Sequence, residues 1–270
     1  MAVSAAHRST GEENKAPDLE ELNTDGSRME KIVFRVIIVA GACCLSAKHV
    51  FIQNDLSWAE ARAYCQNFHV DLSCLTSESE EKLFRLSVDE SKRGWIGAYW
   101  DANFQMWKWS DGENVTYDNN LDLSYSGGTS PPHLKDNVRW KNDGWEWDDG
   151  GHKNDFFCFN LTLVQEEKTW EEALEHCSEK HSNFTSLLSE TENILATKEI
   201  SQTSVTERVW IGLRYLEDSW LWVNGDPLMY QAWSQGGDQL CPMMRRCGAL
   251  TKDGAWESRD CLEKLHFICA

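Results

Sequence analysis

One pattern of tryptophans and cysteines occurs twice along this chain of 270 residues. The first copy starts with SWAEARAYC at Ser57 and closes with FFC at Cys158, and the second starts with TWEEALEHC at Thr169 and closes with FIC at Cys269. From Ser57 to Glu80 the first copy aligns with the second without a gap, at a constant offset of 112 residues. A repeat of this length indicates that one folding unit has been duplicated.

The repeat divides the chain into an N-terminal segment and two domains. We assign residues 48–160 to the first domain and residues 161–270 to the second, and each is long enough to bury a hydrophobic core. Asn160 and Leu161 form nearly the whole linker between them. So short a linker predicts restricted motion between the domains. Two copies joined so closely are also expected to add avidity.

Residues 29–47 have the layout of a secretory signal peptide. Two basic residues precede an apolar run over 36–45, and small residues follow it. Cleavage after Ala47 would leave an intact first strand, and cleavage after Ala42 is the alternative. Residues 1–28 are polar and acidic, and we predict that this extension is disordered.

The alternative for residues 32–47 is a membrane anchor, which would make the protein a type II membrane receptor. A spanning helix needs about 20 apolar residues. Here Arg35 interrupts a shorter run, so the sequence favours the signal peptide and a secreted, extracellular protein. The ten cysteines, with no CxxC pair among them, agree with an oxidising compartment.

Charge and motif content exclude several classes of function. The net charge is −18, and no basic run is longer than Arg245-Arg246, so binding to nucleic acid or to anionic lipid is disfavoured. The chain contains no GxSxG, no HExxH, no P-loop and no dinucleotide-binding fingerprint. We therefore predict that the protein is not an enzyme.

Each copy is expected to open with a short strand and to continue with two helices that begin at capping boxes. In such a box a serine or threonine and a glutamate three residues later satisfy free amides of the first turn. These pairs are Ser57 with Glu60, Ser77 with Glu80, Thr169 with Glu172 and Ser189 with Glu192. After the helices, short aromatic segments separated by Gly, Asn and Asp predict a compact antiparallel sheet.

Two tryptophan pairs, Trp107 with Trp109 and Trp220 with Trp222, each place both rings on one face of a strand. We interpret these rings as core packing rather than as platforms for a ligand. Long polar segments follow them, over 109–136 and 223–246. Loops of this length in a compact domain are typically functional or disordered, so we look for a site there.

Both copies resemble the C-type lectin-like domain nearly end to end. The resemblance rests on the WIG motifs at 95–97 and 210–212, on the two WxW strands and on the closing FFC and FIC. It implies an α+β fold with two tandem domains, each with two helices, small antiparallel sheets and a long irregular loop. The arrangement is similar to a secreted or truncated tandem protein of the macrophage mannose receptor kind.

The family fold implies three disulfides, Cys65–Cys158, Cys177–Cys269 and Cys247–Cys261. In the first copy, counting back from its last cysteine puts Asp136 and Gly150 where the second copy has its inner bridge. The first long loop is therefore predicted to lack that bridge. Cys74 and Cys241 have no family partners. They could pair across the domains, link two molecules or be buried thiols, and for Cys74 the small counterpart Ser186 favours the buried thiol.

Sugar-binding members of the family hold Ca²⁺ with an EPN or QPD loop motif, an acidic residue before the loop cysteine and a WND motif. The second copy has Gly237, Asp238 and Gln239, then Arg245 and Arg246, then Trp256-Glu257-Ser258 at these places. The first copy has Leu134-Lys135 and Trp145-Glu146-Trp147. Ca²⁺ needs six to eight oxygen ligands. We therefore expect neither copy to hold calcium in the family manner, and we assign no metal or cofactor.

Asp148, Asp149, Asp155 and His152 form an acidic group near the end of the first copy. We interpret this group as a solvated loop rather than as a metal site. Three sequons are candidate glycosylation sites in a secreted protein, at Asn114, Asn160 and Asn183.

The leading hypothesis is extracellular recognition of a carbohydrate or protein ligand, outside the usual calcium site. The alternative is a structural or inhibitory secreted protein. The candidate ligand-binding residues are Gly237, Asp238, Gln239, Arg245, Arg246 and Glu257 in the second domain and Glu146 and Trp147 in the first. Met243 and Met244 extend the arginine pair into a patch of a kind that is enriched in protein interfaces.

Overall fold

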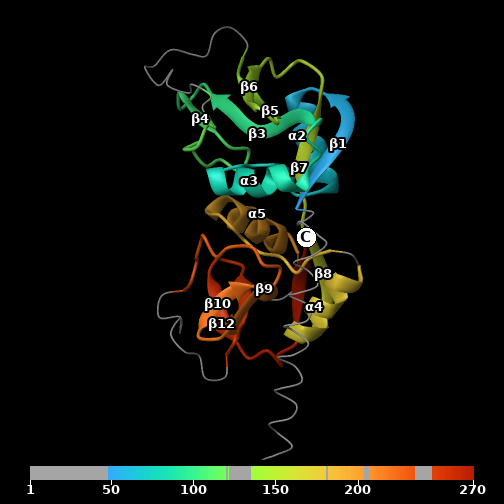
Figure 1. Ribbon diagram of the computed structural model, residues 1–270, viewed down its shortest axis with the longest axis vertical. Coiled ribbons are helices and arrows are strands. Elements are labelled where there is room, and N and C mark those ends of the chain that lie inside the picture. Colours follow the sequence, from blue (N-terminus) through green and yellow to red (C-terminus); the bar gives the residue numbers. More distant parts are fainter. Residues whose placement is uncertain (1–47, 120, 122–134, 181, 204–206, 235–244) are drawn as a thin grey trace, which may run out of the picture.

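The computed structural model describes residues 48–119, 121, 135–180, 182–203, 207–234 and 245–270. Over these residues the chain forms two similar domains stacked along the long axis (Figure 1). The predicted extension and signal segment, residues 1–47, lie outside the described residues. Within the described ranges, no helix combines the length and the apolar character that a membrane span requires.

The first domain contains one mixed sheet with two helices beside it. Its described strands lie in the order β1-β7-β3-β5-β6, with β2 paired to β7 and β4 paired to β3. The elements are β1 (His49–Leu56), α2 (Trp58–Phe68), β2 (Asp71–Leu72), α3 (Glu78–Ser87), β3 (Arg93–Asp101), β4 (Met106–Lys108), β5 (Asn137–Lys141), β6 (Gly144–Asp148) and β7 (Asn154–Phe159).

The second domain repeats this arrangement. Its described strands lie in the order β12-β11-β9-β13-β8, with β10 paired to β9. The elements are β8 (Thr162–Lys168), α4 (Trp170–Glu179), α5 (Glu190–Ser201), β9 (Arg208–Leu216), β10 (Ser219–Trp222), β11 (Cys247–Thr251), β12 (Trp256–Arg259) and β13 (Leu265–Cys269). The α+β class and the tandem of two such domains are thus confirmed.

Most strand pairs are antiparallel, as predicted, but each sheet also contains one parallel pair. Strand β3 runs parallel to β7, with Trp95 beside Phe156, and β9 runs parallel to β13, with Trp210 beside Phe267. The predicted small antiparallel sheets are therefore present, and each is mixed at this one described pair. Periodicity within a strand carries no information about the direction of its neighbour.

The first helix of each domain starts at the predicted capping box, with both reciprocal hydrogen bonds present at Ser57 and Thr169. In the second helix of each domain, α3 and α5, only one of the two hydrogen bonds of the capping box is present. Ser77 still accepts from the amide of Glu80, but the Glu80 carboxylate accepts from the amide of Thr76, at 2.7 Å, one residue before the cap. Ser77 is more extended than Ser57, with φ of −149° against −62°, which turns the preceding amide towards the helix.

All three disulfides implied by the family fold are present, with Cα–Cα distances of 5.4 Å, 5.6 Å and 5.3 Å in chain order. In each domain the longer-range bridge ties the first helix to the last strand. Cys74 is a buried free thiol, as favoured from the sequence. Burial, and then the nearby carboxylates of Asp111 and Asp71, raise the pKa of this thiol well above its usual value. Cys241 lies outside the described residues.

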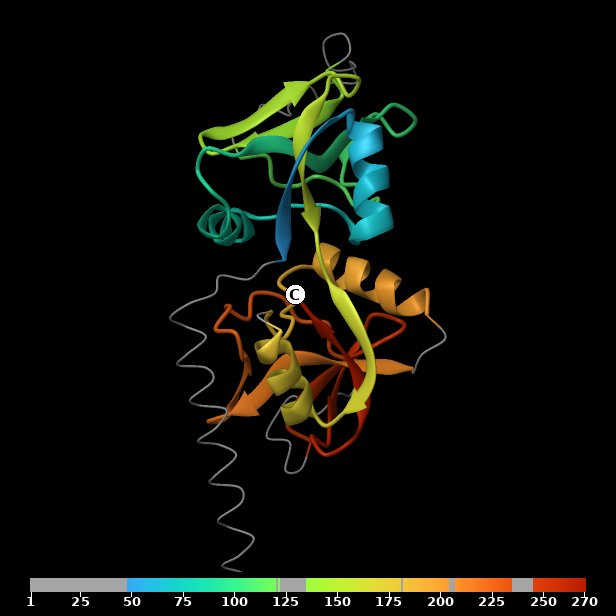
Figure 2. The same ribbon diagram turned by 90° about the vertical axis from the view of Figure 1, so that its right-hand side faces the viewer.

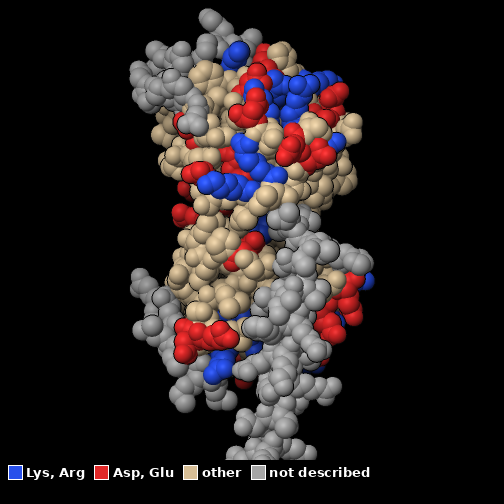
Figure 3. All heavy atoms as spheres, in the orientation of Figure 1, with Lys and Arg blue, Asp and Glu red and all other residues tan. Residues whose placement is uncertain are grey.

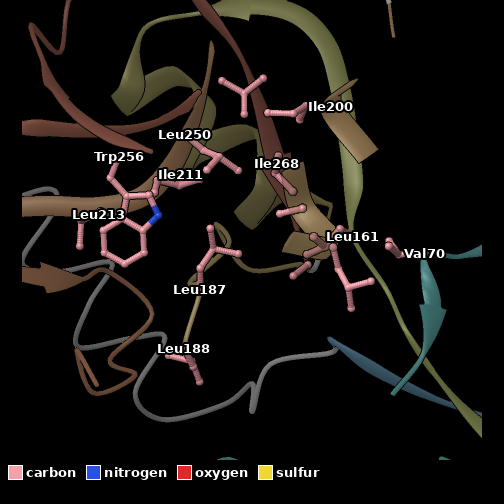
Figure 4. Packing of buried hydrophobic residues seen from close by; sticks show 14 of the residues in the cluster. Val70, Leu161, Leu187, Leu188, Ile200, Ile211, Leu213, Leu250, Trp256 and Ile268 are labelled. Atoms are coloured by element: carbon pink, nitrogen blue, oxygen red, sulfur yellow. The ribbon is translucent and has the colours of Figure 1, made fainter. Parts of the chain in front are cut away.

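Tryptophans fill the cores, as predicted for the paired rings. Trp109 and Trp222 are buried and Trp107 is nearly so, whereas Trp220 is half-buried at the edge of its cluster. The largest apolar cluster of the second domain continues across the linker through Leu161 to Val70 and Phe159 of the first domain. Figure 4 shows Val70 and Leu161 next to each other at the edge of this cluster.

Candidate ligand-binding site

The strand register corrects the position of the missing inner bridge. Trp95 pairs with Arg139 and the equivalent Trp210 pairs with Ala249, so Asn137, and not Asp136, corresponds to Cys247. A Cβ atom added at Gly150 would lie 2.1 Å from Asn137 Oδ1, so these two positions face each other as the cysteines do in the second domain.

The count from the last cysteine was off by one because the first hairpin is one residue shorter. Trp140 pairs with Trp145 across the β5–β6 turn, whereas Leu250 pairs with Trp256 across the β11–β12 turn. The absence of a bridge in the first domain still follows, since Asn137 and Gly150 hold no thiols.

In the second domain Glu257 projects from β12 into a basic setting. Its Oε2 lies 3.2 Å from Arg208 Nε and 4.0 Å from an Nη of Arg259. The two neighbouring positions of the WND place are not available as ligands, because Trp256 is buried and Ser258 is nearly so. Glu257 is thus a carboxylate whose charge is already balanced by guanidinium groups.

Arg245 and Arg246 lie immediately before β11, and both are exposed. The backbone at Arg246 is held in place because its carbonyl accepts from the amide of Tyr215, at 2.8 Å. Among the described residues, no ion pair joins these two arginines to Glu257. Residues 237–239, the predicted Gly, Asp and Gln of the loop motif, lie outside the described residues.

In the first domain the candidate residues Glu146 and Trp147 lie on β6, and the basic partner is Arg139 on β5. Arg139 Nη2 lies 3.0 Å from Glu146 Oε2, and Arg139 Nε lies 3.1 Å from Asp148 Oδ2. A third bond runs from Arg139 Nη1 to Asn154 Oδ1, at 2.8 Å. Trp147 packs partly against the core. Each domain therefore pairs the carboxylate at this place of the motif with an arginine.

The acidic group near the end of the first domain does not form one cluster. His152 Nδ1 lies 2.7 Å from Asp148 Oδ1. Burial would raise the pKa of Asp148, but the His152 hydrogen bond and the Arg139 charge outweigh it and hold that pKa below its usual value. Asp155 is placed apart, where burial and the neighbouring Asp55 raise its pKa.

The described residues do not fit a calcium ion of the family kind. Ca²⁺ requires six to eight oxygen ligands. At the WND place each domain offers one carboxylate, Glu146 or Glu257, and each is already paired with arginine. A guanidinium charge about 4 Å from the doubly charged ion opposes binding by about 8 kcal/mol at an intermediate dielectric.

One further group contains residue types that can bind a metal ion, namely Glu171 with Cys247 and Cys261. The two cysteines are joined in a disulfide and are not available as thiolates. Arg214 lies against the sulfurs and pairs with Glu171, with Nη2 3.2 Å from Oε1. This group is a structural support for β11.

Sequence reasoning missed a buried carboxylate at the base of the first long loop. Glu81 on α3 is 2% exposed and accepts from Tyr117 Oη at 2.8 Å, from Asn119 Nδ2 at 2.9 Å and from Trp140 Nε1 at 3.0 Å. Arg85 pairs with it at 2.7 Å. Tyr117 and Asn119 start the long loop, so Glu81 anchors that loop to the helix.

A sequence signal for this anchor exists, although it is weak. The equivalent residue of the second domain is Asn193, whose Oδ1 accepts from Trp256 Nε1 at 2.8 Å. A polar residue at the same helical position in both copies, three residues before the buried Phe84 or Ala196, indicates a buried polar contact.

The three sequons differ in their exposure. Asn114 is exposed, whereas Asn160 and Asn183 are half-buried. Asn160 Oδ1 lies 2.9 Å from His69 Nδ1, and the backbone of Asn183 pairs with Ala270. Glycosylation of the three asparagines stays a prediction.

Comparison with known proteins finds relatives that match most of this chain. The mouse C-type mannose receptor 2 is 24% identical over 83% of this chain and 18% of its own length. The human lymphocyte antigen 75 is 24% identical over 80% of this chain and 15% of its own. The rabbit (Oryctolagus cuniculus) secretory phospholipase A2 receptor is 27% identical over 80% of this chain and 17% of its own length. The chain thus spans less than a fifth of the length of these relatives.

Among solved structures, human lithostathine is 26% identical with a TM-score of 0.37, over 40% of this chain and 80% of that one. The mouse scavenger receptor C-type lectin carbohydrate-recognition domain is 28% identical with a TM-score of 0.35, over 40% and 86%. The Lectin C-type domain family matches residues 54–160 and again residues 166–270. This chain therefore belongs to the C-type lectin domain family and carries two copies of its domain.

Proposed function

We propose that this protein is a secreted recognition protein that binds a carbohydrate or protein ligand through both domains without a calcium ion. Membership of the lectin family makes recognition, rather than catalysis, the general role of the two domains. The absence of a calcium requirement, the secretion and the binding residues are the parts that we propose here.

One observation carries the calcium-independent mode. In both domains the carboxylate at the WND place is paired with arginine, Glu146 with Arg139 and Glu257 with Arg208. An ion pair of this kind leaves the strand nearly neutral and removes the anionic charge that a hard cation needs. A ligand is then recognised by hydrogen bonds, arginine charge and aromatic contact.

The contact residues follow from exposure and chemistry. Arg245 and Arg246 are exposed just before β11, the strand that pairs with β12 and its Glu257, and Glu146 is exposed beside the partly buried Trp147. Arginine and tryptophan are enriched where proteins bind their partners. Gly237, Asp238 and Gln239 complete the proposed contact surface of the second domain.

The test is a glycan array and a set of immobilised candidate proteins, each probed with the full chain in about 1 mM calcium and again in excess chelator. That concentration covers the weaker extracellular calcium sites. We expect the same ligands to be retained in both conditions. Elution from a sugar column by chelator would contradict the proposal.

A matched pair of variants locates the contact. Arg245→Ala combined with Arg246→Ala should weaken retention about tenfold or more, which corresponds to about 1.4 kcal/mol. Arg93→Ala, at an exposed arginine of the first domain, is the control and should leave retention unchanged. Equal retention by all three proteins would remove the arginine pair from the site.

Secretion has its own test. Expression of the full chain in cultured animal cells should deliver the protein to the medium with Lys48 as its first residue. Recovery of an uncleaved chain in the membrane fraction would support the anchor interpretation of residues 32–47 instead.

A further inference from the structure

Two equivalent helices come near each other at the joint. In Figure 1 α3 of the first domain lies just above α5 of the second, whereas in the turned view of Figure 2 the two helices are offset from each other. Leu83 on α3 and Glu192 on α5 line one cavity between the domains. Glu80 and Glu192, the third residue of each helix, are both buried, with 5% and 4% of their surface exposed. Burying two carboxylates near each other is costly unless a positive charge balances them.

That positive charge is Lys48. Its Nζ lies 3.1 Å from Glu192 Oε2 and 3.8 Å from Asp226 Oδ2, although Lys48 belongs to the first domain and both partners belong to the second. The side chains of Lys48 and Glu192 are 3% and 5% exposed. A cavity of about 30 Å³ lies beside them and is also lined by Glu80 and His49.

Backbone and apolar contacts surround this pair. The carbonyl of Lys48 accepts from the amide of Asn160 at 2.7 Å, so the first strand is fixed to the linker. Val70 and Phe159 bury apolar surface in the core of the second domain. On the face seen in Figure 3, the part of the band between the domains that grey residues leave uncovered is mostly uncharged, apart from a few acidic side chains. The joint therefore resembles the interior of a domain more than a contact between two mobile ones.

The direction of the last strands places the two candidate sites far apart. Strands β7 and β13 are equivalent, and both end at the joint, because β7 runs into the linker and the C-terminus lies between the domains in Figures 1 and 2. Their first residues, Asn154 and Leu265, lie on the sides away from the joint. Each strand spans roughly 15 Å at about 3.3 Å per residue.

The proposed binding residues lie at these outer sides. In the first domain Asn154 contacts Arg139, which holds Glu146, and in the second domain β12 is followed by the turn that leads into β13. Figure 1 accordingly places β6 near one end of the long axis and β12 towards the other. We call these two regions the outer ends of the tandem.

We propose that the buried Lys48–Glu192 pair locks the two domains into one rigid body with its binding sites at opposite outer ends, so that the protein joins two separate ligand molecules. The two-ligand part rests on the proposed function, whereas the lock and the orientation do not. A compact ligand cannot reach both outer ends. The avidity expected from the duplication is then available only to ligands presented on two separate bodies or along an extended chain.

The test measures the distance between spin labels at the two outer ends by pulsed electron resonance, and it requires no ligand. Lys153 and Lys264 are exposed, lie just before β7 and β13 and occupy equivalent positions, so each is changed to cysteine and labelled. In the same full-length chain Cys43, Cys44 and Cys241, which lie outside the described residues, are changed to serine so that they cannot take up label. Two stacked domains of this size predict one narrow distance of the order of 50 Å.

Lys48→Met then removes the charge and keeps the length of the side chain. We expect this variant to broaden the distance distribution and to speed amide hydrogen exchange in α3 and α5 about tenfold, because it leaves Glu192 buried without its partner. Glu192→Gln keeps the hydrogen bond to the amide of Leu188, at 2.8 Å, and is the milder variant if Lys48→Met does not fold. Lys82→Met is the matched control, since Lys82 pairs with Glu78 at 2.8 Å on the exposed surface.

Two results would overturn the proposal. A broad or short distance in the labelled parent chain would show that the domains are not locked in this orientation. Unchanged distance and exchange in both Lys48→Met and Glu192→Gln would show that the buried pair is not the lock. Failure to find a calcium-independent ligand would contradict the proposed function but would leave these distances as they are.

Discussion

The inner disulfide of the second domain should be transferable to the first, and this tests the register that separates Asn137 from Asp136. The perturbation is the double change Asn137→Cys with Gly150→Cys. A Cβ atom built at Gly150 lies 3.0 Å from Asn137 Cγ, and Asn137 Cβ is one bond further back. This separation is compatible with the Cβ–Cβ distance of about 3.8 Å in disulfides.

The expected gain follows from loop closure. The bridge would close a loop about as long as that between Cys247 and Cys261, whose sequence separation is 14. Loop-closure entropy then predicts about 3 kcal/mol of added stability. For a domain of about 110 residues this corresponds to a rise of roughly 10 °C in the melting temperature of the first domain.

The assay has two steps. Alkylation of the native protein followed by peptide mapping shows whether the two introduced cysteines have joined, and urea unfolding followed by tryptophan fluorescence gives the change in stability. Asn137→Ser with Gly150→Ser is the control for the two side-chain changes. Asp136→Cys with Gly150→Cys is the competing pair, because a simple count from the last cysteine favours it.

Spontaneous bridging of the pair at positions 137 and 150, with no bridge from position 136, is the expected outcome. A bridge from position 136 together with free thiols at position 137 would refute the register. A bridge at position 137 that lowers the melting temperature would refute the argument from loop closure instead, because strain would then exceed the entropic gain.

Three further predictions concern single residues. Glu81→Gln should lower the free energy of unfolding by about 2 kcal/mol in urea titrations, because it weakens a buried set of hydrogen bonds, whereas Glu90→Gln at an exposed position should change nothing. Burial, followed by the charge of Lys48, lowers the pKa of His49 to about 3, so the unfolded chain binds a proton below about pH 6.5 that the folded chain does not. Relative to His49→Gln, the parent should therefore lose about 1.4 kcal/mol of unfolding free energy per pH unit as the pH falls from about 6.5 towards 3. Equal slopes of unfolding free energy against pH in the two proteins would contradict this pKa. Asn114→Gln should remove one glycan, seen as the loss of one mobility step on glycosidase treatment, since Asn114 is the exposed sequon.

Much of the fold could be predicted because local sequence patterns determine it and each of these patterns occurs twice. The capping residues at Ser57 and Thr169 fix where the first helices begin, and the alternating tryptophans identify strands whose rings enter the core. The three disulfides followed from the family resemblance, since cysteine spacing alone does not determine which cysteines pair.

Other features depend on contacts between distant parts of the chain. The glutamates of the second capping boxes, Glu80 and Glu192, look like surface residues in the sequence, yet both are buried at the joint. Lys48 carries no motif at all, and its role arises only because the second domain brings Glu192 to it. The exposed arginines before β11 could be predicted as candidates, but the arginine pairing of Glu146 and Glu257 required the strand register.

The buried pair at the joint uses positions that are not equivalent in the two domains. The strand registers make Asn160 the counterpart of Lys48, yet the Asn160 side chain contacts His69 of the first domain and not Glu80, the counterpart of Glu192. In a twofold-symmetric contact each pair occurs twice, once in each direction. The joint is therefore heterologous: the first domain supplies the cation, the second supplies the carboxylate, and two copies of similar fold have different roles in it.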